Sequence, residues 1–299
     1  MEKEFITIIK NALNSDYIGD DCAHLKDLGI TISQDSLVEN IHFLRNKITP
    51  WQLGWKSAMV NISDTCASGA EPKYLTIALS LPKDIDKSFI EEFYAGVKSA
   101  CQNIEVVGGD LTASDKIYIS VTAIGTTKNR NISSRSNAKV GQKIIISGNC
   151  GSSALGLKQI LSTSPIQPNE FTKAHLEPIA QRDFSKKIAT NQKAAYAMMD
   201  TSDGLMDALI QIAKASNVVM TIDFNKIPHA KEIENEQNWQ ELILFGAEDY
   251  QLLATVDTIP ENAIVIGEVQ QVQQSFGVKI NNEFYSEACI NDKCFKHFG

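Results

Sequence analysis

The chain has 299 residues, of which 43% are hydrophobic and 21% charged, a composition typical of a soluble globular protein with room for two domains. Acidic residues outnumber basic ones by 36 to 28, the net charge is −8, and no block of Lys and Arg occurs, which excludes nucleic acid as a partner. A small anionic substrate is compatible with this charge only if a cation mediates its binding.

The first half of the chain alternates between strand and helix patterns. Strands are predicted at 30–34, 74–81, 104–108 and 116–125. Helices are predicted at 50–69, which begins with Pro and ends with Gly, and at 84–103, which is amphipathic. The polar stretch 126–142 is rich in Ser and Asn and is typical of a linker.

The second half continues the alternation. Strands are predicted at 143–147, 218–224, 249–256 and 262–269. Helices are predicted within 148–161, around 172–190, and at 203–216 with Ser202 as the N-cap. The pattern therefore predicts a mixed α/β protein with two halves.

Membrane and redox signals point to the cytoplasm. No apolar run is long enough to span a bilayer, and the first residues, MEKEFITIIK, are unlike a secretory signal. The six cysteines are scattered without a C-x-x-C pair, which argues against a zinc ribbon or a disulfide framework. We therefore expect a cytoplasmic protein with reduced thiols.

Several aspartates stand near the ends of predicted elements. The stretch IGDDCAHL (18–25) contains Asp20 and Asp21 side by side, although two Asp residues after Gly are also common in simple turns. Asp35 follows the strand ITISQ. Asp110 follows two glycines that would let a ligand approach the backbone closely. These positions are candidates for ligand binding.

Two further aspartates flank the predicted start of the helix at 203–216. Asp200 ends the apolar run AYAMM, and Asp203 follows Ser202. An acid in the first turn of a helix also stabilises the helix dipole, so Asp203 has a structural alternative that is about as plausible as a functional one.

Asp64 lies within a largely apolar helical stretch. Ser57, Asn61 and Ser68 share its face at helical spacing, and no Lys or Glu follows position 56 before residue 70. A stripe of short polar groups on such a helix more often lines a site than faces bulk water. The pattern therefore predicts that this face of the helix lines a site.

The aspartates together indicate Mg²⁺ and a phosphate-rich substrate such as ATP. Buried carboxylates in this number need a cationic partner, and the nearby sequence supplies few bases. Oxygen ligands without a His/Cys set favour Mg²⁺ over zinc. Mg²⁺ takes only one or two carboxylates and completes its shell with water and phosphate, so several acids imply several ions.

Standard nucleotide-binding signatures are absent from the sequence. There is no G-x-x-x-x-G-K-[ST] motif, and the protein-kinase motifs are missing. The loop SGNCGSSALG (147–156) has glycines but no lysine, so it is interpreted as a strand-to-helix turn with at most a weak anion site.

A set of motifs nevertheless resembles one known family. In chain order the motifs are GDDCAHL (19–25), SQDSLVENIHF (33–43), GWKSAMVNISDTCASGA (54–70), VVGGDLTAS (106–114), SRSNAKVGQ (134–142), MMDTSDGL (198–205) and GAEDYQLL (246–253). Each motif is weak alone, but their order and spacing over nearly the whole chain resemble the thiamine-monophosphate kinases. That family belongs to the superfamily of aminoimidazole ribonucleotide synthetase.

The resemblance implies a fold, an activity and an assembly. The implied activity is ATP-dependent phosphorylation of thiamine phosphate to thiamine diphosphate, with several Mg²⁺ ions and ATP as co-substrate. The implied α/β fold has an N-terminal ATP- and Mg²⁺-binding domain (1–137), which also forms the dimer interface, and a C-terminal domain (138–299) that completes the substrate site. The implied assembly is a homodimer in which the N-terminal mixed sheets pair.

Site residues follow from the resemblance position by position. Those at Mg²⁺-binding positions are Asp21, Ser33, Gln34, Asp35, Asp64, Asp110, Asp200 and Asp203. Those at ATP-contacting positions are Tyr94, Gly109, Asp110, Arg135 and Ser202. Those at substrate-contacting positions are His42, Glu248 and Phe295, for which a core histidine, a surface charge and simple C-terminal packing are the respective alternatives.

No side chain is expected to act as an acid or base. The acceptor is a phosphate monoester that is already ionised near neutral pH, so transfer depends on positioning and electrostatics. The alternatives are another ATP-using member of the superfamily, similar to selenophosphate synthetase or to the hydrogenase-maturation member, and a noncatalytic ATP–Mg²⁺-binding protein. The reactive Cys–Lys segment near the N-terminus and the reactive Cys tail of those two relatives have no counterpart in the sequence.

Overall fold

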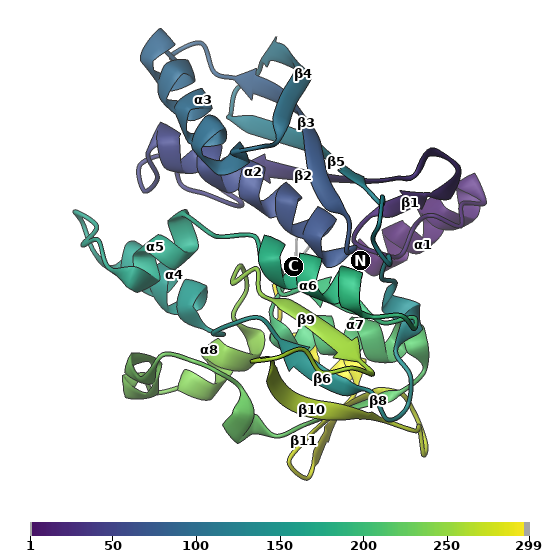
Figure 1. Cartoon of the computed structure of the whole chain (residues 1–299). Coiled ribbons are helices and arrows are strands. Elements are labelled where there is room, and N and C mark those ends of the chain that lie inside the picture. The colour runs from purple at the N-terminus through teal and green to yellow at the C-terminus, as the bar shows by residue number, and fades with distance from the viewer. Residues whose placement is uncertain (1, 296–299) are drawn as a thin grey trace.

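The computed structural model describes residues 2–295, which form two β-sheets with helices packed on them (Figure 1). The first half contains, in order, α1 (Glu2–Leu13), β1 (Ala23–Leu25), β2 (Ile30–Val38), α2 (Pro50–Ala67), β3 (Glu71–Leu81), α3 (Lys87–Cys101), β4 (Glu105–Ala113) and β5 (Tyr118–Thr126). Its five strands are arranged in the order β1-β2-β5-β3-β4, and β3 and β4 are parallel. The other neighbouring strands are antiparallel, so the sheet is mixed, as predicted.

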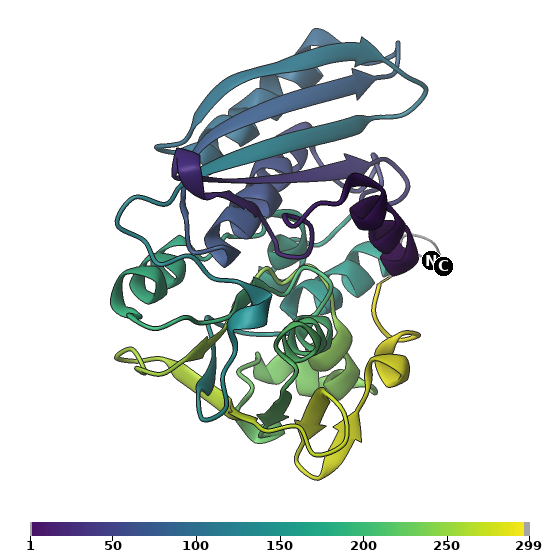
Figure 2. The ribbon, with the colours of Figure 1, turned by 90° about the vertical axis from the view of Figure 1, so that its right-hand side faces the viewer.

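One face of this first sheet is covered by α2 and α3, and the other face is open (Figure 2). Helix α2 begins at a capping box, because the Thr49 side chain accepts from the backbone of Gln52 and the Gln52 side chain accepts in return. Pro50 fits the first helical position, where no backbone N–H is needed. The buried side of the sheet forms an apolar core with both helices.

Two glycines allow α2 and α3 to approach each other closely. A Cβ added at Gly54 would lie 1.9 Å from the carbonyl oxygen of Phe93, and one added at Gly96 would lie 1.9 Å from that of Trp51. Backbone atoms cannot yield as a flexible side chain can, so any larger residue forces the two helices apart.

We expect Gly96→Ala to lower the free energy of unfolding by about 1–3 kcal/mol, because the added methyl overpacks the helix contact. The matched control is Gly108→Ala on β4, where an added Cβ has no neighbour within 4 Å. Urea denaturation of the two variants measures the difference. Equal stability of the variants would contradict the close-packing interpretation.

Between residues 138 and 295 the structure has thirteen α-helices and β-strands. In order they are β6 (Lys143–Ile146), α4 (Ser152–Ser162), α5 (Glu170–Leu176), α6 (Arg182–Asn191), β7 (Met198–Asp200), α7 (Leu205–Ser216), β8 (Val219–Ile222), α8 (Trp239–Phe245), β9 (Leu252–Val256), β10 (Ile264–Gln270), β11 (Gly277–Ile280), β12 (Glu283–Tyr285) and α9 (Glu287–Ile290). The strands form a sheet in the order β12-β11-β8-β10-β6-β9-β7. The prediction of a mixed α/β protein with two halves is confirmed.

The two halves share part of their packing. The first residue of the stretch predicted as a linker, Thr126, ends β5, and from 127 to 142 the chain crosses between the sheets with only the 3-10 turn Arg135–Asn137 as regular structure. The apolar core of the first sheet also includes Ile188 of α6 and Met198 of β7. The domain boundary at 137–138 lies in this crossing and stays a prediction.

Three details of the predicted elements were wrong. Strand β4 does not end at its glycines but continues through Asp110, and Gly109 allows close approach of the β3 backbone, because its Cβ would lie 1.9 Å from the Ile77 carbonyl oxygen. The predicted helix around 172–190 is two helices, broken near Pro178, which lacks the N–H that a continuous helix needs. Helix α7 has Gly204 rather than Ser202 as its N-cap.

Among residues 2–295 no helix combines the length and the apolar composition needed to cross a membrane. No disulfide is present among residues 2–295. Elements that the sequence reasoning missed include α1, which has 12 residues, and the short elements β7, β12 and α9. Most of them have four residues or fewer, too short for a periodic pattern.

Candidate active site

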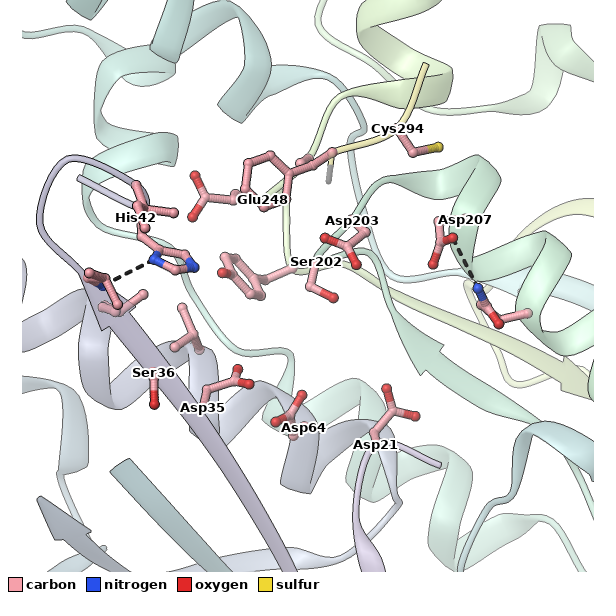
Figure 3. Close-up of a pocket in the computed structure, with 18 of the residues that line it drawn as sticks. Asp21, Asp35, Ser36, His42, Asp64, Ser202, Asp203, Asp207, Glu248 and Cys294 are labelled. Carbon is pink, nitrogen blue, oxygen red and sulfur yellow. Dashed lines mark hydrogen bonds between the residues drawn. The ribbon is translucent and has the colours of Figure 1, made fainter. Parts of the chain in front are cut away.

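A cavity of about 2080 Å³ lies between the two halves. The first half contributes Asp21, Asp35 and Asp64, and the second half contributes Ser202, Asp203 and Glu248 across from them (Figure 3). A pocket for one small ligand usually measures roughly 300–1,000 Å³. The cavity therefore has room for two substrates.

Three predicted aspartates meet at this cavity, with Asp21 and Asp64 in its lining and Asp200 buried next to them. Ligand oxygens of Asp21, Asp64 and Asp200 all lie within 4.8 Å of one another. Asp21 precedes β1, Asp64 lies on α2, and Asp200 ends β7. Asp200 is 1% exposed, and one of its oxygens accepts a 2.5 Å hydrogen bond from the Ser63 hydroxyl. Residues far apart in the sequence thus form one cluster of carboxylates.

The cluster is short of positive charge. Burial, followed by the charges of Asp35, Asp200 and Asp21, raises the pKa of Asp64 well above its ordinary value. Burial and the charge of Asp21 raise the pKa of Asp200 to about 7. Carboxylates that repel one another in a buried place are stabilised by a divalent cation with oxygen ligands. The three side chains therefore fit a Mg²⁺ site.

Arg135 places a positive charge against Asp21. Its guanidinium lies 3.0 Å from an Asp21 oxygen, and its backbone N–H donates to Asp20 at 2.7 Å. Its Nε is buried without a hydrogen-bond partner. The nearby sequence supplies few bases for Asp21, and the base in contact with it, Arg135, comes from the distant connecting segment.

Residues 33–35 of β2 alternate between the two faces of the first sheet, as strand geometry requires. Ser33 and Asp35 point to the α2 side, where the Ser33 hydroxyl is buried without a partner and the Asp35 N–H donates to Asn61. The Gln34 side chain points to the open face and donates to Ser120 at 3.0 Å. Gln34 therefore lies on the opposite face of β2 from Ser33 and Asp35, although it too belongs to the lining of the cavity.

The polar stripe predicted on α2 does not line the cavity. Ser57 and Ser68 are buried and donate to backbone carbonyls of their own helix. The lining positions are Lys56, Val60 and Asp64, spaced four residues apart. Asp64 is placed as expected, but its helical neighbours are not, because local hydrogen bonds satisfy their hydroxyls.

Three predicted ATP-contacting residues lie away from the cavity lining. Tyr94 is 38% exposed on α3, and Gly109 and Asp110 lie on the edge strand β4, every residue of which is exposed. Asp110 pairs with Ala78 of β3, so the strands β3 and β5 separate it from β2. Within one chain these residues do not join the aspartate cluster.

The predicted substrate-contacting residues gather at the other end of the cavity. The Nδ1 atom of His42 accepts a 3.0 Å hydrogen bond from the Val38 N–H, which fixes the ring. The Phe295 ring lies 6.5 Å from the His42 ring, centroid to centroid, and is 45% exposed. Figure 3 shows Glu248 facing His42. His42 is therefore a cavity-lining residue and not part of the core.

Glu248 has two basic neighbours that the sequence reasoning missed. Lys56 Nζ lies 2.9 Å from one carboxylate oxygen, and His175 Nδ1 lies 3.4 Å from the other. Burial alone would raise the pKa of Glu248, but its basic neighbours, Lys56 first among them, outweigh burial, and the pKa is lower than usual. The sequence did contain one indication of this contact, because Lys56 is a single lysine within the otherwise mostly apolar run GWKSAMV.

The glycine loop after β6 is occupied by a carboxyl group of the protein itself. Asp249 accepts from the backbone N–H groups of Gly151 at 2.5 Å and Ser153 at 2.8 Å, at the start of α4. The weak anion site considered for this loop is therefore filled by the Asp249 carboxylate.

Comparisons with known proteins decide the family. Residues 19–127 match the N-terminal domain of AIR synthase related proteins, and residues 139–279 match the C-terminal domain. The thiamine-monophosphate kinase of Aquifex aeolicus is 37% identical over 98% of this chain and 96% of its own length. The chain belongs to the thiamine-monophosphate kinase family.

Solved structures agree with this assignment. The structure of AaThiL complexed with AMPPCP and TMP superimposes with a TM-score of 0.88, at 35% identity over 98% of this chain and 96% of that one. Hydrogenase maturation protein HypE in complex with ATP gives a TM-score of 0.70 at 19% identity, over 93% and 91% of the two chains. The second likeness shows a shared fold alone, whereas the first is a likeness within the thiamine-monophosphate kinases.

Proposed function

We propose that the chain transfers the γ-phosphate of ATP to thiamine phosphate, producing thiamine diphosphate. The single observation that carries this proposal is the cavity between the halves, which has a carboxylate cluster at one end and His42, Glu248 and Phe295 at the other. The names of the relatives and the ligands in AaThiL support the choice of substrates.

Mg²⁺ is the proposed metal cofactor. Asp21, Asp64 and Asp200 would hold it, with Ser33, Asp35 and Asp203 as further ligands near the cavity. The bound metal would neutralise phosphate charge, which explains how a chain of net charge −8 accepts two anionic substrates. The raised pKa values of Asp64 and Asp200 support this proposal.

Arg135 and Ser202 are proposed to contact ATP from within the same chain, since both line the cavity. Arg135 orients Asp21 and is a positive group beside which phosphate oxygens can bind.

We further propose a homodimer, in which Tyr94, Gly109, Asp110 and Gln34 act at the partner's site or at the interface. Asp110 and Gln34 both project from the open face of the first sheet, beside Tyr118, which is 40% exposed. The exposed edge strand β4 supports the same conclusion, because proteins rarely leave a long strand edge uncovered. A cytoplasmic location is part of this proposal.

Transfer needs no general base in this proposal. The acceptor phosphate is already ionised near neutral pH, so the task of the protein is to bring two anions into line and exclude water. His42 and Glu248 position the acceptor, and the aspartate cluster marks where the donor phosphates lie. No covalent intermediate is required.

The test is a comparison of acceptors. We expect thiamine phosphate to support turnover with ATP and Mg²⁺, and free thiamine to react at least about 10²-fold more slowly, because its hydroxyl would need a base. ADP and thiamine diphosphate are measured by chromatography. Equal or faster turnover of free thiamine would overturn the assignment, and ATP binding without turnover of either acceptor would favour the noncatalytic alternative.

A further inference from the structure

Lys56 is a buried lysine that joins the two halves of the molecule. The residue is 1% exposed on α2, and its ammonium donates to the backbone carbonyl of His175 at 3.1 Å in addition to its 2.9 Å contact with Glu248. A lysine is almost never fully buried unless it is paired, because losing the hydration of an ammonium costs several kcal/mol. Its contacts with the second half therefore account for its position.

Glu248 is held in place from several directions. Its backbone has φ of 65°, in the left-handed region that residues other than glycine seldom adopt, and its N–H donates to the Ser202 carbonyl at 2.7 Å. His175, beside its carboxylate, is itself anchored by Ser153, whose hydroxyl oxygen lies 3.0 Å from Nδ1. Unusual backbone conformations of this kind cluster at functional sites. The Glu248 side chain still reaches the cavity, with 22% of its surface exposed.

His175 does not supply the positive charge at this position. Burial, followed by the charge of Lys56, lowers the pKa of His175 to about 4, so its ring is neutral at physiological pH. Lys56 is thus the cation in direct contact with the carboxylate. One Glu248 oxygen is bound to Lys56, and the other lies on the His175 side.

We propose that Lys56 is a positioning residue for the acceptor: it keeps the Glu248 carboxylate charged and oriented toward the thiazolium and aminopyrimidine of thiamine phosphate. This inference rests on the proposed function. It adds that recognition of the acceptor depends on a contact between the halves, because Lys56 belongs to the first half and Glu248 to the second. A carboxylate that is held in place favours an acceptor that carries a positive charge or an amino group.

The test is a double-mutant cycle on Lys56→Met and Glu248→Gln. We expect each single change to raise the KM for thiamine phosphate by roughly tenfold or more, with the KM for ATP within about twofold, because a charged hydrogen bond is lost at the acceptor end only. The double variant should lose no more than the worse single variant if Lys56 acts through Glu248. Thermal melting of each variant is measured in parallel.

Two further variants complete the experiment. Lys56→Gln keeps a donor for the His175 carbonyl without the charge, and it replaces Lys56→Met if that variant does not fold. Lys143→Met is the matched control, because Lys143 forms an exposed pair with Glu268 on the second sheet, away from the cavity. We expect the control to leave both KM values unchanged.

The outcomes separate this inference from the proposed function. If Glu248→Gln raises the KM for thiamine phosphate and the Lys56 variants do not, Lys56 is not a positioning residue and the proposed function stands. If Glu248→Gln leaves that KM unchanged, Glu248 has no role in binding the acceptor and the inference fails with it. Multiplying losses in the double variant, or a lower melting temperature with both KM values unchanged, would assign Lys56 a role independent of Glu248.

Discussion

Replacing Asp64 with Asn is expected to reduce turnover by roughly 10²-fold or more at ordinary Mg²⁺ concentrations, because charge neutralisation and positioning supply most of the rate of phosphoryl transfer. Asn has the size of Asp but removes one of three carboxylates whose oxygens lie within 4.8 Å of one another. Part of the activity should return at high Mg²⁺, since mass action refills a weakened site. A Mg²⁺ titration of turnover measures both effects.

The control for this prediction is Asp20→Asn. Asp20 stands beside Asp21, but its side chain accepts from the Arg135 backbone N–H at 2.7 Å, and an Asn side-chain oxygen can accept the same bond. We therefore expect a much smaller loss from Asp20→Asn. An Asp64→Asn enzyme with full activity and an unchanged Mg²⁺ midpoint would show that the cluster does not bind the catalytic metal.

The same substitution, Asp64→Asn, is also expected to have a large effect on stability, and this effect is an increase, whereas the effect on activity is a loss. In metal-free buffer at pH 8, we expect Asp64→Asn to melt at a higher temperature than the unmodified protein. The reason is that burial and the neighbouring charges of Asp35, Asp200 and Asp21 raise the pKa of Asp64, so its ionised form destabilises the fold. One substitution would thus lower activity and raise the stability of the metal-free protein.

The pH dependence follows from the direction of the pKa shifts. Between the ordinary carboxyl range near pH 4 and the raised native value, which for Asp200 is about 7, the native cluster binds protons that the unfolded chain has released. Its contribution to the free energy of unfolding is therefore present at low pH and is lost as pH rises. A tenfold change in proton affinity corresponds to about 1.4 kcal/mol, so the total amounts to several kcal/mol.

Melting curves in EDTA from pH 5 to pH 8 test this prediction. The difference between Asp64→Asn and the unmodified protein should be several degrees at pH 8 and should shrink as the pH falls, because protonation of Asp64 removes the charge that Asn lacks. Added Mg²⁺ should stabilise the unmodified protein most at pH 8. A difference that does not change with pH would mean that the cluster is not electrostatically strained.

Much of the architecture could be predicted from the sequence because local patterns carry it. The start and stop signals of helix α2 lie within or directly beside the helix in the sequence, with Thr49 and Pro50 at its start and Gly69 after its end. The alternating patterns of β3 and β5 likewise reflect one covered face and one open face of the first sheet. The family could be recognised because its motifs occur in order over nearly the whole chain.

The motifs in the sequence also pointed to several residues that line the cavity, among them Asp21, Asp64 and Glu248. Asp21, Asp64 and Asp200 were all candidates before their distances were known. The sequence could not show which basic residue pairs with which aspartate. Nothing local relates Asp21 to Arg135, because the contact forms only when the connecting segment folds back between the sheets.

Only the tertiary structure decided which charges compensate one another and which residues stay apart. It placed Lys56 against Glu248 across the two halves, and it placed Asp249 on the glycine loop. It also placed Asp110 on an exposed edge strand, away from the cluster. The physical reason is that hydrophobic periodicity specifies which face of an element is buried, whereas electrostatic partners depend on how distant elements pack.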